Sequence, residues 1–101
     1  MVFIYTTCKN IDEAKKLGRS LIEKHLAACV NIWPINSMYF WKEELRDDAE
    51  AALLIKTNEP KVADIEDFIT TNHSYSTPLA ATVNVHRLNR AYKEWMSTVV
   101  L

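Results

Sequence analysis

One apolar stretch, residues 26–34, constrains this chain more than any other feature of its sequence. Its side chains are small, β-branched or aromatic and almost uncharged, which is the composition of a strand buried on both faces. Pro34 cannot donate a hydrogen bond to a sheet, so the chain has to bend, bulge or lie at an edge there. A second strand-like segment follows over residues 37–42. The pattern predicts one long interrupted strand, whose two faces have to be covered.

The other segments alternate between strand-like and helix-like patterns. Residues 2–7 are apolar or β-branched at both odd and even positions, as expected of an interior strand with both faces covered. Asn10 can cap the first turn of a helix, while Glu13, three residues later, reaches back to the cap. The same reasoning predicts helices over residues 10–25, 58–72 and 90–99 and strands over 50–57 and 79–86. Residues 43–48 are predicted to form a charged turn or a long hairpin tip that reverses the chain.

This order, β-α-β-β-α-β with a short C-terminal helix, predicts a ferredoxin-like α+β fold with a four-stranded antiparallel sheet and both main helices on one face. The other face of the sheet is then bare. The first three strands are apolar on both parities, and Trp33, Tyr39 and Trp41 add large rings. Burying one large apolar side chain contributes roughly 1.5–3 kcal/mol, so we expect a homo-oligomer to cover the bare face.

Length and charge limit the remaining possibilities. With 101 residues, of which 49% are hydrophobic and 25% charged, the chain is expected to form a single domain over residues 1–101. The net charge is −1 and the basic residues are scattered, which argues against a nucleic-acid partner. Residues 1–7 lack a basic start, so we expect neither a signal peptide nor a membrane span and predict a cytoplasmic protein. The two cysteines are then expected to stay free thiols.

Several motifs occur in the order seen in one known family. They are residues 7–10 (TCKN), 26–32 (LAACVNI), 39–42 (YFWK), 55–57 (IKT), 73–78 (HSYSTP) and 92–95 (YKEW). Over its whole length the chain resembles CutA, the divalent cation tolerance protein family, and the LAACVNI run joined to Tyr-x-Trp is the specific part of the signal. The resemblance implies a tight homotrimer organised like the PII-like signalling proteins, with the long second and third strands crossing between subunits. It also implies a role in tolerance of divalent metals, copper above all, and no enzymatic activity.

The sequence departs from the family pattern in its turns. The family loop commonly reads His-Pro-Tyr-Glu/Gln-x-Pro, whereas Ser74 and Ser76 stand here in place of the proline and of the carboxylate or amide. Glu43 and Leu88 occupy positions where a glycine is usual. Because Gly18 is the only glycine in the chain, other residues have to make these turns. If the usual carboxylate helps to hold a metal in the family, this chain lacks that ligand.

Four residues are candidates for a metal site: Cys29, His73, Cys8 and Glu50. Cys29 is either a small buried hydrophobe or a thiolate ligand for a soft ion such as Cu(I). Cys8 is either a plain turn residue or a thiolate favoured by the helix start beside it. His73, in a polar loop, is the best ligand or acid–base candidate. No Cys-x-x-Cys or His-x-x-x-His motif accompanies them, so we expect weak binding or a site shared between subunits.

Three hypotheses of different classes remain. The first is a non-enzymatic, trimeric, metal-responsive protein that binds copper or a similar cation weakly. The second is a PII-like signalling or anchoring module, whose clefts between subunits hold a small anionic ligand or a partner peptide. The third is a cysteine-dependent enzyme built on Cys29 and His73, which lacks an evident orienting acid and a glycine-rich oxyanion loop.

Overall fold

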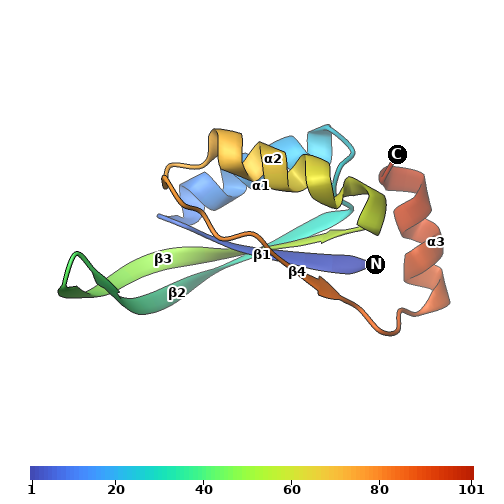
Figure 1. The fold of residues 1–101 in the computed structure, drawn as a ribbon. Coiled ribbons are helices and arrows are strands. Elements are labelled where there is room, and N and C mark those ends of the chain that lie inside the picture. The colour runs from blue at the N-terminus through green and yellow to red at the C-terminus, as the bar shows by residue number, and fades with distance from the viewer.

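The computed structural model describes all 101 residues. Figure 1 shows two helices over one face of a four-stranded sheet and a third helix at the end of the sheet. The strands are antiparallel in the order β2-β3-β1-β4, which confirms the predicted α+β fold. The elements are β1 (Val2–Cys8), α1 (Ile11–Glu23), β2 (Cys29–Trp41), β3 (Glu44–Thr57), the 3₁₀ turn η1 (Glu59–Lys61), α2 (Val62–Asn72), β4 (Ala81–Asn84) and α3 (Arg90–Val99).

Helix α1 begins at the predicted cap and packs directly on the sheet. The Asn10 side chain accepts a hydrogen bond from the Glu13 N–H at 2.8 Å, which satisfies one of the free amides of the first turn. Gly18 marks a close approach to β2, since a Cβ atom at this position would lie 2.9 Å from Val30 Cγ2. The missing side chain therefore sets how near the helix comes to the strand.

The hydrophobic core lies between the two main helices and the covered face of the sheet. Along β1 every second residue is buried, because alternate side chains of a strand point to the same face. The register places Ile4 opposite Ile55, so both strands contribute to the same layer. The largest fully buried core members are Ile4, Leu21, Leu53, Ile55, Ile65 and Ile69.

Strand β2 differs from its prediction. It runs without interruption from Cys29 to Trp41, and Pro34 keeps its place in the register opposite Ala51. A proline is tolerated because β2 is an edge strand, whose outer side pairs with no other strand of the subunit. The predicted interruption is therefore wrong, and residues 26–28, expected within the strand, precede it.

Residues 43–48, predicted to form a charged turn or a long hairpin tip, form the hairpin tip. The chain reverses over Lys42 and Glu43 alone, and β3 begins at the next residue. Both turn residues have positive φ, 51° and 65°, the region that two-residue hairpin turns of type I′ use. Charged residues beyond the turn stay in the strand because they find partners across it: the Tyr39 hydroxyl donates to Asp48 at 2.7 Å.

Strand β4 is shorter than predicted, whereas α3 matches its prediction. Strand β4 spans Ala81–Asn84 instead of residues 79–86, and at its C-terminal end the pairing with β1 stops at Val2, where β1 begins. Helix α3 spans Arg90–Val99 and lies against the end of the sheet, where Lys56 Nζ lies 5.9 Å from the centre of a ring on α3. No helix is both long and apolar enough to cross a membrane.

The β2–β3 hairpin extends beyond the helices, to the left in Figure 1. We call residues 36–49 the free hairpin. Both of its faces carry large apolar side chains, because residues of both parities are apolar there. Met38, Phe40 and Leu45 share one face and are 68%, 74% and 59% exposed, while Trp41 on the other face is 53% exposed. The rest of the chain leaves this part of the sheet uncovered.

Candidate metal centre and adjoining groove

Three possible metal ligands meet where β1, α1 and α2 begin or end. Cys8 is the last residue of β1, Glu13 lies in the first turn of α1, and His73 follows the last residue of α2. One donor atom from each of the three side chains lies within 4.8 Å of the other two. A thiol, an imidazole and a carboxylate together suit borderline or soft divalent cations. We call these three residues the ligand cluster.

His73 is held by hydrogen bonds at both ring nitrogens. Its Nε2 lies 2.8 Å from the Thr7 carbonyl oxygen, which can only accept, so we assign the ring proton to Nε2. Nδ1 is then the acceptor, and the Tyr75 N–H donates to it at 3.0 Å. The imidazole is thereby fixed in one tautomer, and its only lone pair in the ring plane is engaged.

The Glu13 carboxylate joins the start of α1 to the loop after α2. One oxygen accepts from the Lys9 N–H and the other from the Ser74 N–H, both at 3.0 Å. Partial burial raises the pKa of Glu13, but hydrogen bonds from Ser74 and Lys9 outweigh it, so the pKa lies below its ordinary value. The sequence predicts that the Glu13 side chain accepts a hydrogen bond from the backbone of Asn10, the cap residue. It accepts one from the N–H of Lys9 instead.

Cys8 is the most protected member of the ligand cluster. Its side chain is fully buried, and burial, together with the negative charges of Glu13 and Glu50, raises the pKa of the thiol to about 12. The predicted thiolate-favouring setting of Cys8 is therefore wrong, because lost hydration and two nearby carboxylates outweigh the helix dipole. A cation that binds Cys8 has to displace the thiol proton.

Glu50 lies beside the ligand cluster but on the opposite face of the sheet. Cys8 pairs with Ala51, and side chains alternate along a strand, so the adjacent Glu50 points the other way. The Glu50 carboxylate accepts a hydrogen bond from the Tyr75 hydroxyl. Burial and this contact with Glu50 raise the pKa of Tyr75 above its ordinary value. The loop after α2 thus supplies His73 to the ligand cluster on one face of the sheet, and Tyr75 from the same loop binds Glu50 on the other.

A groove of about 510 Å³ lies on the Glu50 side of the sheet. The free hairpin contributes Tyr39, Trp41 and Arg46, β3 contributes Glu50, and the loop after α2 contributes Tyr75. We call it the hairpin groove. Its volume falls in the range of small-molecule sites, roughly 300–1,000 Å³. Its lining combines aromatic rings with charges of both signs, so it suits a ligand that stacks and also carries polar groups.

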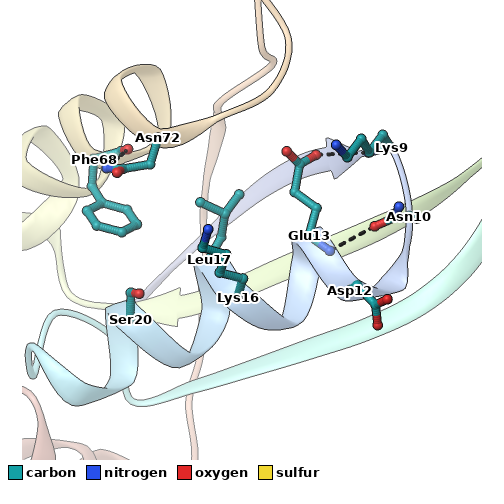
Figure 2. Close-up of a pocket in the computed structure, with 9 residues that line it drawn as sticks. All are labelled: Lys9, Asn10, Asp12, Glu13, Lys16, Leu17, Ser20, Phe68 and Asn72. Atoms are coloured by element: carbon teal, nitrogen blue, oxygen red, sulfur yellow. Dashed lines mark hydrogen bonds between the residues drawn. The ribbon is translucent and has the colours of Figure 1, made fainter.

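A second hollow, of about 400 Å³, opens between α1 and α2 (Figure 2). Figure 2 shows Lys9, Asn10 and Glu13 at one end, joined by the hydrogen bonds of the helix start, and Phe68 and Asn72 of α2 at the other. Glu13 is shared between this hollow and the ligand cluster. The bonds at the helix start therefore fix where the carboxylate stands relative to Cys8 and His73.

Cys29 lies at the other end of the sheet. It pairs with Lys56, whereas Cys8 pairs with Ala51, so five positions of β3 separate the two cysteines, about 17 Å along the strand. The odd number of positions also puts them on opposite faces. Cys29 is half-buried and close to Tyr92 of α3. Within one subunit the two thiols can neither form a disulfide nor share a metal ion.

Glu13 and Tyr75 are functional candidates that sequence patterns do not reveal. The capping pattern identifies Glu13 as a helix-start residue, but its second oxygen binds the N–H of Ser74, 61 residues away. The HSYSTP loop marks the region of Tyr75, but the partner Glu50 lies 25 residues away. Both contacts depend on how the elements pack, and local sequence carries no signal for either.

Known proteins resemble this chain over its whole length. The family model described as CutA1 divalent ion tolerance protein matches residues 2–99. The divalent-cation tolerance protein CutA of Thermotoga maritima is 37% identical over 101 residues, which cover 100% of both chains. The protein of the same description from Archaeoglobus fulgidus is 36% identical over 98 residues, 97% of this chain and 96% of the relative.

Solved structures share the fold. The Archaeoglobus fulgidus protein, described as a periplasmic divalent cation tolerance protein, superposes with a TM-score of 0.95 at 35% identity and 100% coverage of both chains. CutA1 from Pyrococcus horikoshii superposes with a TM-score of 0.97 at 25% identity, covering 100% of this chain and 99% of that one. The match over residues 2–99 and the identity to full-length relatives show that this chain belongs to the CutA1 family of divalent ion tolerance proteins.

Proposed function

We propose that this protein works as a homotrimer of single-domain subunits in divalent cation tolerance, that it binds a cation weakly, and that it is not an enzyme. The proposed assembly is supported chiefly by the exposure of the free hairpin. Its side chains Met38, Phe40 and Leu45 are each more than half exposed. Burial of each such side chain contributes roughly 1.5–3 kcal/mol, which a second copy can supply. The unpaired edge of β2 adds free backbone groups to the same surface. The number three comes from the family resemblance.

The ligand cluster is the best supported place for the cation. Cys8, Glu13 and His73 fit copper or a similar cation by their donor chemistry, and Glu50 adds negative charge nearby. Binding is expected to be weak, because Cys8 has to lose a proton and His73 a hydrogen bond. When bound, the cation supplies a positive charge that offsets the charge of the Glu13 carboxylate. Cys29 joins a site only where a neighbouring subunit brings further ligands to it.

Copper titration by calorimetry tests the cluster. The wild-type protein is expected to bind with micromolar or weaker affinity, and His73→Ala and Cys8→Ala are expected to lose that binding. Cys29→Ser is the matched control, which keeps the affinity, and circular dichroism checks that all variants fold. Unchanged affinity in both cluster variants would remove these residues from the site. Loss in Cys29→Ser alone would move the site to a seam between subunits.

The same geometry supports a non-enzymatic role. A cysteine-dependent enzyme needs a thiolate and an imidazole free to act as a base. Cys8 is a buried neutral thiol, and the acceptor nitrogen of His73 is engaged by Tyr75. Cys29 lies at the far end of the sheet. Selective alkylation of one thiol at pH 7, with loss of a measured turnover, would overturn this part of the proposal.

The hairpin groove favours a second candidate function, a PII-like signalling or anchoring module. Its volume of about 510 Å³ and its aromatic lining suit a small ligand or a partner peptide held between subunits. Glu50 makes it less suitable for a purely anionic ligand than for one that also carries a positive charge. A thermal-shift screen separates the two functions. A melting temperature raised by a metabolite or peptide but not by metals favours the module, and the reverse favours cation binding.

We propose that the protein is cytoplasmic, because a reducing compartment suits a chain whose two cysteines are free thiols. The Archaeoglobus fulgidus relative is described as periplasmic, and cell fractionation distinguishes the two locations. Cell fractionation with compartment markers is expected to recover the protein with the cytoplasmic marker. Recovery with a periplasmic marker would contradict this location.

A further inference from the structure

Tyr75 contacts both the ligand cluster and the hairpin groove. On the cluster side its backbone N–H donates to His73 Nδ1 at 3.0 Å, and its ring lies 4.7 Å from the His73 ring, centre to centre. On the groove side its hydroxyl donates to the Glu50 carboxylate, and both residues line the groove. No candidate ligand set includes Tyr75, and no local sequence pattern indicates its contact with Glu50. A displacement of Tyr75 would therefore change its contacts on both faces of the sheet, with His73 on one and with Glu50 on the other.

A cation that uses His73 breaks the bond from Tyr75 by either nitrogen. If the cation takes Nδ1, it replaces the Tyr75 N–H directly. If it takes Nε2, the ring proton has to leave that nitrogen, and on Nδ1 it would face the Tyr75 N–H, donor against donor. Both routes require His73 and Tyr75 to move apart.

Two contacts resist that movement. The Tyr75 hydroxyl is bonded to Glu50, and the preceding residue, Ser74, is held through its N–H by Glu13 at 3.0 Å. The first contact lies outside the ligand cluster and can be removed without touching a ligand. A hydrogen bond to a charged group changes an equilibrium constant by about tenfold to a hundredfold.

We propose that Tyr75 is a positioning residue that couples the ligand cluster to the hairpin groove. Cation binding at His73 displaces Tyr75, loosens its bond to Glu50 and changes the shape of the groove. Coupling of this kind is reciprocal, so an occupant of the groove that strengthens the Tyr75–Glu50 bond weakens cation binding by the same factor. The inference rests on the proposed binding of a cation at the ligand cluster.

Tyr75→Phe tests the coupling with zinc as the probe, because Zn²⁺ accepts sulfur, nitrogen and oxygen ligands and is redox-inactive. The substitution keeps the ring and the backbone N–H and removes only the hydroxyl that binds Glu50. Calorimetry is expected to show an affinity up to about tenfold to a hundredfold higher than that of the wild type. Tyr39→Phe is the matched control: it removes the hydroxyl bond to Asp48 in the same groove, has no contact with His73, and is expected to leave the affinity unchanged.

Trp41 supplies a second readout, which a merely structural role of Tyr75 would not change. It lines the groove, and Trp33→Phe with Trp95→Phe leaves it as the only tryptophan. Saturating zinc is expected to shift the Trp41 emission in this background. The shift is expected to shrink when Tyr75→Phe is added, because the bond between loop and groove is then missing.

The possible outcomes distinguish a failure of the coupling from a failure of the proposed cation binding on which it rests. Equal zinc affinity in the wild type and in Tyr75→Phe would overturn the coupling and leave cation binding intact. An equal rise of affinity in Tyr39→Phe would also overturn the coupling, because the effect would then belong to the groove in general. Absence of zinc and copper binding in every variant would overturn the proposed cation binding, and the coupling with it.

Discussion

The two ends of the long β2–β3 hairpin carry similar side chains in different surroundings. Beneath the helices Leu53 and Ile55 are fully buried in the core. On the free hairpin Leu45 and Phe40 are just as apolar but are 59% and 74% exposed. The difference lies only in what covers the sheet, helices of the same subunit in one case and nothing from that subunit in the other. An apolar strand pattern therefore does not tell whether helices of the same chain cover the surface.

The same substitution at the two ends tests this contrast most strongly. Leu53→Ala empties core volume and is expected to lower the free energy of unfolding by about 2–5 kcal/mol, whatever the protein concentration. Leu45→Ala, its control on the free hairpin, is expected to act only through assembly, so its effect on the denaturation midpoint depends on concentration. Urea denaturation at several protein concentrations measures both. Equal, concentration-independent losses would contradict the contrast.

Thiol reactivity shows how well the covered face excludes water. In a Cys29→Ser background, Cys8 is expected to react with iodoacetamide at pH 8 at least about a hundredfold more slowly in the native than in the unfolded protein, because burial raises its pKa to about 12. The unfolded thiol ionises first, so this group destabilises the fold as pH rises above the ordinary value of 9.0. Mass spectrometry follows the reaction, and equal rates in the two states would show that Cys8 is open to water.

Gly18→Ala tests how tightly α1 lies on the sheet. The new Cβ would meet Val30 Cγ2 at 2.9 Å, and the stiff β-branched side chain of Val30 has little room to give way. After allowing for the better helix propensity of Ala, the free energy of unfolding is expected to fall by about 0–2 kcal/mol. Adding Val30→Ala is expected to make the Gly18→Ala step less harmful, as a double-mutant cycle would show. A stabilising Gly18→Ala would mean that the helix lies further from β2.

The smallest expected effect lies in the turn of the free hairpin. Glu43 has φ of 65°, in the left-handed region that favours glycine. Glu43→Gly removes that strain but adds freedom to the unfolded chain, so a net gain of about 0.5 kcal/mol is expected. Thermal unfolding measures the gain, with Glu44→Gly, in the adjoining strand, as a destabilising control. A loss at Glu43 would contradict the turn geometry.

Element order and fold were predictable from the sequence, because they depend on local periodicity and capping. Asn10 caps α1 as predicted, and α3 has the predicted bounds. The errors arose where pairing overrides local preference. Pro34 stays in a strand because β2 is an edge strand, and the acidic residues after Glu43 stay in a strand because partners lie across from them. Neither fact can be read from a single segment.

The candidate site was predictable only in part. Cys8 and His73 lie together, yet the register puts Cys29 at the other end of the sheet and Glu50 on the opposite face. Glu13 takes the third place in the cluster. Spacing along the chain does not show which face of the sheet a strand residue points to, because that depends on the register, which the sequence does not give. The protonation of Cys8 depends likewise on burial, which the sequence does not state.

Light scattering at dilute concentration tests most directly whether other copies cover the free hairpin. The wild-type protein is expected to have three times the subunit mass of 11.7 kDa. Phe40→Asp is expected to reduce the mass towards that of one subunit, because it places a charge on the apolar face, whereas Lys15→Asp on the exposed face of α1 keeps the assembly. A soluble, folded wild-type particle with the mass of a single subunit would contradict the account.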